Sequence, residues 1–223
     1  LKGLRRGRIR LIASQATAPA FLPAALASFR KHHPLVDFEV QIGDRRQAIE
    51  ALRNYESDLA LTFGLDADPD IEALASFEQK LMLLMHRSHP LARTTGAVRL
   101  RQCVDYPIVL AAGDIGGRLL LNRFLARSSL RLAPVIESNS FEFLRGCLRH
   151  DQALTFQIAL GAVSDGDQLV ARDIEDRGFP RGQLVLAHLR ERSMPVIATA
   201  LAEHLRAHLS PPAPEREHDP VDV

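Results

Sequence analysis

The chain has 223 residues, of which 46% are hydrophobic, and its 28 Lys and Arg residues nearly balance its 27 Asp and Glu residues. That length allows one large domain or two lobes of roughly 100 residues each, and the hydrophobic share is enough for a core. A formal net charge of +1 gives no bulk electrostatic footprint for nucleic acid. No apolar run approaches the ~18 residues of a membrane span. The opening is too polar for a signal peptide, so we expect a cytoplasmic protein without a membrane partner.

Strand-like and helix-like runs alternate along almost the whole chain. Most strand-like runs are short, rich in Leu or β-branched residues, and bounded by Gly, Pro, Asp or Asn, as in a buried parallel sheet. The expected strands are 8–13, 36–42, 58–63, 81–86, 108–111, 132–137, 153–158 and 183–189. The expected helices are 19–32, 44–54, 117–128, 140–150 and 195–209. The repeated β-α-β order predicts an α/β fold with right-handed crossovers.

The segment 8–40 places a polar loop between a strand and a helix. In that helix Leu22, Leu26 and Phe29 repeat at spacings of four and three, which predicts one apolar stripe. The loop, Ser-Gln-Ala-Thr at 14–17, leads onto the helix N-terminus, where free N–H groups and the positive end of the helix dipole face the same spot. This arrangement indicates a site for a polar or anionic ligand.

Two turn-rich segments, 66–71 and 86–96, divide the chain into two expected lobes. The β-α-β pattern restarts after them, over 107–158, and the last helix can return to pack on the first lobe. The expected division is lobe I at 1–76 and 190–209, lobe II at 77–189, and a disordered tail, rich in Pro and charge, at 210–223.

Five segments carry a family resemblance. They are LKGLRRGRIRLIAS, FLPAALASFRKHHPLVDFEV, QAIEALRNYESDLAL, LMLLMHRSHPLA and VRLRQCVDYPIVL. In this order they resemble the motifs of the effector-binding domain of LysR-type transcriptional regulators, over about residues 3–209. Each motif alone is weak, but five in order are hard to obtain by chance. The resemblance implies the type 2 periplasmic-binding-protein fold, in which two Rossmann-like α/β lobes enclose a ligand cleft.

The chain departs from the family pattern at a few positions. Tyr55 and Glu56 stand where a Gly is usual, and Asp151 with Ala153 replace glycines that commonly precede the late strand. These changes affect the expected local turns and leave the expected fold unchanged. Cys103 stands where the family usually has a buried Leu, which favours a structural role for that thiol.

Polar loops at the carboxyl ends of the expected strands supply the candidate binding residues. Ligands of two-lobe sheet proteins bind at these strand ends, in the crevice between the lobes. The resemblance implies an effector in the same place. The candidate ligand-binding residues are Ser14, Gln15, Thr17, Thr62, Phe63, Gly113, Asp114, Ser138, Asn139 and Gln157.

Several of these residues have a plain structural alternative. Ser14 or Thr17 can cap the first helix, and Ser138 or Asn139 can cap the helix that follows it. Phe63 can belong to the core instead of stacking on a ligand. Hydroxyls, amides and helix N-termini together complement a carboxylate, so we expect a small organic acid or an amino-acid-like molecule.

The resemblance also implies partners. Regulators of this family carry an N-terminal winged helix-turn-helix, and no such pattern precedes residue 8. We therefore expect a regulatory half that reaches DNA only through a domain outside this chain, and that shifts between lobe orientations when its effector binds. The family's domains pair side by side, which here implies a homodimer or tetramer through helices near 21–32 and 118–128.

Two other classes stay open at the level of sequence. GDIGGR at 113–118 followed by Glu137 imitates a dinucleotide fingerprint, and Arg118 could instead neutralise an anionic effector. No catalytic set accompanies the fingerprint, and neither the nine His residues nor Cys103 and Cys147 have metal-ligand spacing, so we expect no enzyme and no cofactor. A solute-binding protein for transport would share the fold.

Overall fold

The computed structural model describes residues 6–94, 96–113, 115, 117–162 and 168–209, so the tail expected at 210–223 lies outside it. The helices are α1 (Phe21–His32), α2 (Arg45–Arg53), α3 (Gly117–Leu125), α4 (Phe141–His150) and α5 (Val196–Leu209). The strands are β1 (Gly7–Ala13), β2 (Val36–Ile42), β3 (Leu59–Phe63), β4 (Ile71–His86), β5 (Ile108–Ala111), β6 (Pro134–Ser138), β7 (Leu154–Ile158), β8 (Leu169–Arg172) and β9 (Arg181–Leu189). Short 3-10 turns are η1 (Gln15–Thr17), η2 (Leu65–Ala67), η3 (Pro90–Arg93), η4 (Leu100–Cys103) and η5 (Ala159–Gly161).

The strands form a mixed sheet in the order β2-β1-β3-β9-β4-β7-β5-β6, with β8 paired to β4. β1 is parallel to β2 and β3, and β5 is parallel to β6 and β7. The long strand β4 changes partners along its length: residues 71–80 pair with β9, and residues 81–86 pair with β7 and β8. The hydrogen-bonded path is therefore continuous, but it turns from one half of the molecule to the other within β4.

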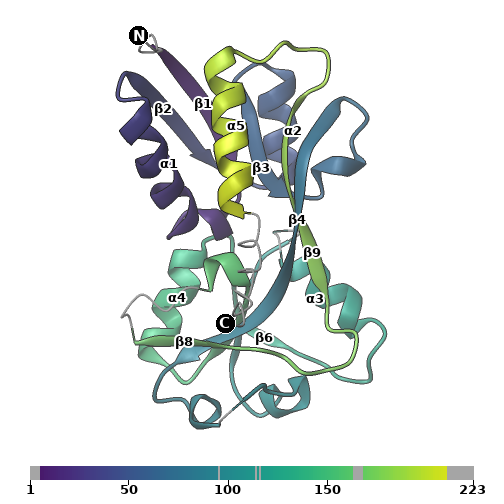
Figure 1. Cartoon of the computed structure of the whole chain (residues 1–223). Coiled ribbons are helices and arrows are strands. Elements are labelled where there is room, and N and C mark those ends of the chain that lie inside the picture. Colours follow the sequence, from purple (N-terminus) through teal and green to yellow (C-terminus); the bar gives the residue numbers. More distant parts are fainter. Residues whose placement is uncertain (1–5, 95, 114, 116, 163–167, 210–223) are drawn as a thin grey trace, which may run out of the picture.

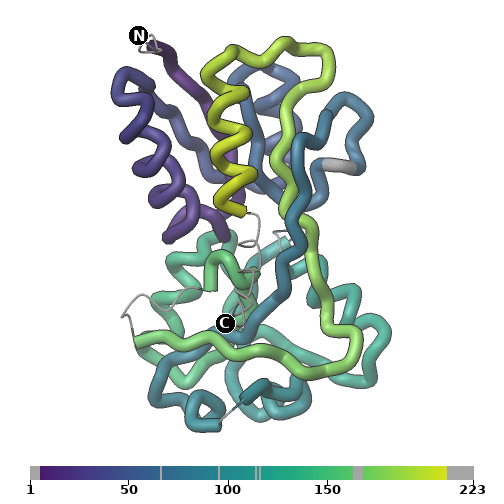
Figure 2. The backbone as a smooth tube through the Cα atoms, in the orientation of Figure 1, coloured from purple at the N-terminus to yellow at the C-terminus, as the bar shows by residue number. Residues whose placement is uncertain are grey.

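Figures 1 and 2 show the elements in two groups that β4 and β9 connect. We call β1–β3, α1, α2 and α5 the first lobe, and β5–β8, α3 and α4 the second lobe. The α/β class that the sequence predicts is confirmed. Because α5 follows β9 and returns to pack beside α1, the first lobe is built from both ends of the described chain.

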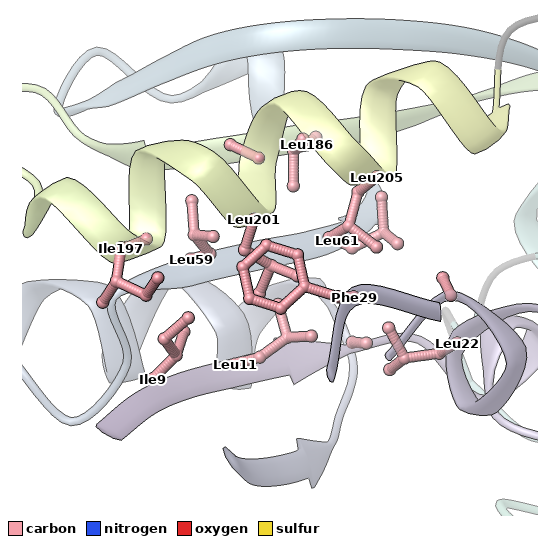
Figure 3. Close-up of a cluster of buried hydrophobic side chains, with 14 of the residues drawn as sticks. Ile9, Leu11, Leu22, Phe29, Leu59, Leu61, Leu186, Ile197, Leu201 and Leu205 are labelled. Atoms are coloured by element: carbon pink, nitrogen blue, oxygen red, sulfur yellow. The ribbon is translucent and has the colours of Figure 1, made fainter. Parts of the chain in front are cut away.

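Phe29 of α1 lies at the centre of the first-lobe core, between α5 on one side and β1 on the other (Figure 3). Its side chain is 1% exposed. The buried stripe of α1 runs through Leu22, Ala25 and Phe29, at spacings of three and four, while the predicted Leu26 is half-buried. Leu184 and Leu186 of β9 complete this core, ahead of the lobe boundary at 190 that the sequence predicts.

The second lobe has a core on each face of its sheet. Leu83 and Phe156 belong to one core, which α3 enters through Leu121. Leu84 belongs to the other core, which α4 covers through Leu144. Side chains alternate between the faces of a strand, so the residues of β7 on either side of Phe156 point toward α4.

Candidate functional site

The loop after β1 is fixed by its own hydrogen bonds. The Ser14 N–H donates to the Leu61 carbonyl over 2.9 Å, which holds the loop against the end of β3. The buried Thr17 hydroxyl donates to the Ser14 carbonyl over 2.8 Å. Neither side chain caps α1, whose N-cap is Ala20. The capping alternative is therefore not realised for these two residues.

Gln15 reaches from this loop to the second lobe. Its Nε2 donates to the Asn139 carbonyl, and its Oε1 accepts from the Phe141 N–H at 2.7 Å. Two of the loops that the sequence predicts to converge thus touch directly, although they are far apart along the chain. These hydrogen bonds join the two lobes at their facing loops.

The loop after β6 leads into α4. The Ser140 hydroxyl accepts from the Phe143 N–H over 3.2 Å and caps the helix, while Ser138 Oγ accepts from the Ser140 N–H over 3.1 Å. The N-cap of α4 is thus Ser140, whereas the sequence suggested Ser138 or Asn139 for this role. The Ala112 N–H donates to the Ser138 carbonyl, which brings the end of β5 and the following Gly113 beside this loop.

Gly113 has a φ of 64°, in the left-handed region that favours glycine, so the backbone turns sharply at this point. Asp114, also predicted as a ligand-binding residue, lies outside the described residues.

Three buried polar side chains at the end of β1 and in β7 have atoms without a described partner. Ser14 Oγ, Thr155 Oγ1 and Gln157 Nε2 have no hydrogen-bond partner within the described part of the chain. Gln157 Nε2 lies against Gly161, where a Cβ would approach it to 2.7 Å and would meet Ala16 Cα at 2.9 Å. Gly161 thus allows η5 to pack on η1, close to the Gln157 amide. Buried polar groups without partners are uncommon and indicate either strain or a binding function.

A buried arginine approaches the same region. Arg145 of α4 is buried, and its Nη1 donates to the Gly161 carbonyl over 3.4 Å. The guanidinium therefore lies close to η5, on the α4 side of the second lobe.

Thr62 and Phe63 end β3 at the junction of the lobes. Thr62 is buried, and Phe63 packs against the core clusters of both lobes. Position 182 on β9 holds a glycine because a Cβ there would lie 3.3 Å from the Phe63 ring and 2.8 Å from Leu120. These contacts give Phe63 a packing role at the junction of the lobes.

Residues of the dinucleotide-like fingerprint make ion-pair and packing contacts within the protein. Arg118 Nη1 lies 3.2 Å from Glu137 Oε2 and donates to the Ala111 carbonyl over 2.9 Å. Glu137 therefore neutralises an arginine of the same chain. Gly117 is small because a Cβ would meet Leu81 at 2.5 Å. Arg118, Glu137 and Gly117 thus have packing or pairing roles that require no nucleotide.

The described residues give little support for a reactive cysteine or a metal site. Cys103 and Cys147 are both free thiols. Burial, with a smaller contribution from the charge of Asp176, raises the pKa of Cys103 to about 12, so this thiol is inert at neutral pH. Across the described ranges no three His, Cys, Asp or Glu side chains gather as a metal ion would require. None of the described helices is long and apolar enough to cross a bilayer.

Arg145 and Thr155 are not among the residues that the sequence predicts for the site. Arg145 had a detectable signal, because it stands in the apolar stripe of α4 with Phe141, Leu144 and Leu148. A charged residue within such a stripe needs a buried partner or a ligand. Thr155 had no signal, since threonine is common in ordinary strands.

Comparison with known families and proteins gives a consistent result. A family model described as "LysR substrate binding domain" matches residues 2–210. The transcriptional activator CmpR of Synechocystis is 25% identical over 213 residues, which cover 93% of this chain and 68% of that protein. The regulator CbbR of Rhizobium meliloti is 33% identical over 126 residues, or 56% of this chain and 40% of that protein. The curated relatives are thus transcriptional regulators, and this chain spans only part of their length.

Solved structures show the same fold. The effector-binding domain of QuiR, in complex with shikimate, superposes with a TM-score of 0.77 at 19% identity, covering 92% of this chain and 98% of that one. The CcmR regulatory domain of Synechocystis, in complex with 2-PG, gives 0.78 at 20% identity with the same coverage of both chains. Such domains have the type 2 periplasmic-binding-protein fold, so this prediction is confirmed.

Proposed function

Because the chain belongs to the LysR substrate binding domain family, we propose that it senses a small polar or anionic effector bound between its two lobes. We further propose that it works as the regulatory half of a cytoplasmic LysR-type transcriptional regulator. DNA is then contacted by another domain of the full-length protein. The alternative of a dinucleotide-binding enzyme is not supported, since the relatives are named transcriptional regulators.

The observation that carries the proposal is the meeting of the β1–α1 loop with the N-terminus of α4 through Gln15. The Ser14 hydroxyl and the Gln157 amide nitrogen lie next to this meeting point and have no hydrogen-bond partner among the described residues. A ligand with hydroxyl and carboxylate groups would satisfy these groups at low cost. Shikimate and 2-PG, which the two related domains hold, belong to this range of polarity.

We propose that the effector is held by polar side chains and backbone groups from both lobes, with the lobes divided at about residues 76 and 190. The proposed binding residues are Ser14, Gln15, Thr17, Thr62, Phe63, Gly113, Asp114, Ser138, Asn139 and Gln157. The effector would favour one relative orientation of the lobes, and thereby one arrangement of the oligomer. β4 and β9, which connect the lobes, are the segments that would bend.

The side-by-side dimer that the family implies also finds support. β2 and β6 end the strand order, and both present exposed apolar side chains, among them Val40 and Val135. A shallow groove of about 350 Å³ lies between α1 and β2, and another of about 270 Å³ borders α3. We propose that α1 and β2 of one copy pack against α3 and β6 of the other.

A binding experiment tests the proposed site. A panel of organic acids and amino acids that includes shikimate and 2-PG is screened by thermal shift, and each hit is titrated by calorimetry. We expect Gln157→Leu to weaken a hit at least about tenfold, since an amide that bonds the ligand is removed. Gln168→Leu is the control, because that exposed side chain bonds His86 away from the loops. A hit that binds both variants equally would contradict the proposed site.

A further inference from the structure

Gln15 satisfies both ends of its amide on the opposite lobe. Its Oε1 accepts from the Phe141 N–H at 2.7 Å, and its Nε2 donates to the Asn139 carbonyl. Phe141 is the first residue of α4, a ten-residue helix capped by Ser140. Two N–H groups in the first turn of this helix therefore have partners. The Phe143 N–H donates to the Ser140 cap within the second lobe, and the Phe141 N–H donates to Gln15 of the first lobe.

The Phe141 N–H and the Asn139 carbonyl, which Gln15 bonds, place a hydrogen-bond donor beside an acceptor. A helix N-terminus ordinarily favours an anion, because its free N–H groups and its dipole point the same way. Here a neutral amide occupies the position. A carboxylate could accept from Phe141 but would oppose the Asn139 carbonyl, whereas an amide offers an acceptor and a donor together. The pair therefore selects a group that carries both.

A second observation is that buried polar groups lie close to the Gln15 loop. Ser14 Oγ and Gln157 Nε2 have no hydrogen-bond partner among the residues that the structure describes, although these side chains belong to residues only 7% and 2% exposed. Ser14 directly precedes Gln15, and Gln157 Nε2 lies against Gly161, which packs on Ala16. Gln15 thus bonds the backbone at the start of α4, and it bonds neither of these two buried groups.

We propose that Gln15 is a latch that holds the lobes together in the effector-free domain. The effector releases it by presenting its own adjacent acceptor and donor to Phe141 and Asn139. This inference rests on the proposed function and names the anchoring group of the effector. A 2-hydroxy acid, a 2-amino acid or a primary amide carries such a pair, and a simple carboxylate does not. Effector affinity is then set by competition with Gln15 as well as by direct contacts.

Amide hydrogen exchange of the ¹⁵N-labelled chain, without any ligand, tests the latch. We expect Gln15→Ala to speed exchange of the Phe141 amide at least about tenfold, because its acceptor is removed. Exchange at the Leu61 amide in the first-lobe core should stay unchanged, which shows that the variant is folded. Gln47→Ala is the matched control, since that amide accepts from the Asp44 N–H over 2.9 Å within the first lobe. It should leave Phe141 as in the wild type.

Small probes test the anchoring group. Acetamide supplies the group that Gln15→Ala removes, and we expect it to slow Phe141 exchange in that variant more than sodium acetate does at equal concentration. Equal Phe141 exchange in the wild type and Gln15→Ala would overturn the latch. A stronger effect of acetate than of acetamide would overturn the anchoring group. Neither result depends on finding an effector. Failure of the proposed function would give a different result, namely effectors that bind away from the loops.

Discussion

Tyr55 has a backbone φ of 58°, in the left-handed region that side chains other than glycine rarely adopt. It follows α2 at the place where the family usually has a glycine. Its side chain is exposed, and the Arg192 guanidinium lies 5.1 Å from the ring centroid. The turn is therefore kept despite the substitution, with a local cost of about 1 kcal/mol that a cation–π contact of similar size offsets.

The stability of variants at position 55 should depend on how well the new residue tolerates a left-handed backbone, and not on its size. We expect Tyr55→Val to lower the free energy of unfolding by about 1–2 kcal/mol, because a β-branched residue is poorly suited to this conformation. Tyr55→Asn should stay within about 1 kcal/mol of the wild type, since asparagine tolerates the left-handed region. Urea unfolding measures both. Equal losses in the two variants would show that the contact with Arg192 dominates instead.

At the scale of elements, α1 and α5 meet through aromatic and imidazole rings. Phe29 of α1 stacks with His33 and lies edge-on to His204 of α5, with centroids 4.3 and 5.3 Å apart. His204 Nε2 lies 3.0 Å from the Ala25 carbonyl, and the His208 ring is 4.1 Å from the His204 ring. Burial chiefly lowers the pKa of His204; His208, His32 and His33 lower it further, while the Ala25 carbonyl opposes them.

This depressed pKa predicts a loss of stability in mild acid. The folded pKa lies below the unfolded value of 6.5, so the unfolded chain binds the proton more readily and stability falls as pH drops below about 6.5. Burial also lowers the pKa of His89, which adds to the loss. We expect thermal unfolding midpoints between pH 7.5 and 5.5 to fall less in His204→Gln, which keeps a donor for Ala25. Identical slopes in the variant and the wild type would contradict this role.

Most elements follow from local patterns in the sequence, and the exceptions have physical reasons. The expected helices and strands are found with ends shifted by a few residues, as for α4 and β7. The first half of β4 was missed because residues 71–80 form a ribbon with β9 that buries few side chains, so hydrophobicity marks only 81–86 as a strand. β8 was missed because its pairing with β4 is not local in the sequence.

The candidate site was predictable to the level of its loops. The rule that strand ends carry ligands placed Gln15 and Asn139 on facing loops, and the structure joins them. The rule could not identify Arg145, which stands inside a helix, nor show that Gln15 would bond Phe141. Those contacts depend on how the lobes close, which is a property of the tertiary structure.

At the scale of the whole molecule, the two exposed sheet edges predict self-association. We expect sedimentation equilibrium to show a dimer, and Val135→Asp on β6 to weaken it at least about tenfold, because a charge would be buried at the interface. Val196→Asp is a matched control, since Val196 on α5 is 66% exposed and Val135 is 65% exposed. A wild-type chain that remains monomeric at high concentration, or equal effects of both variants, would exclude this dimer.

The proposed function requires the facing loops of the two lobes to enclose the effector. A crystal structure of the chain with any organic acid that raises its melting temperature would show directly where the compound binds. We predict the compound between the loop of Gln15 and the N-terminus of α4, within hydrogen-bond distance of Ser14 or Gln157, with the Gln15 amide released from Phe141. A compound bound only on the outer sheet edges, with Gln15 still bonded to Phe141, would contradict the proposed site.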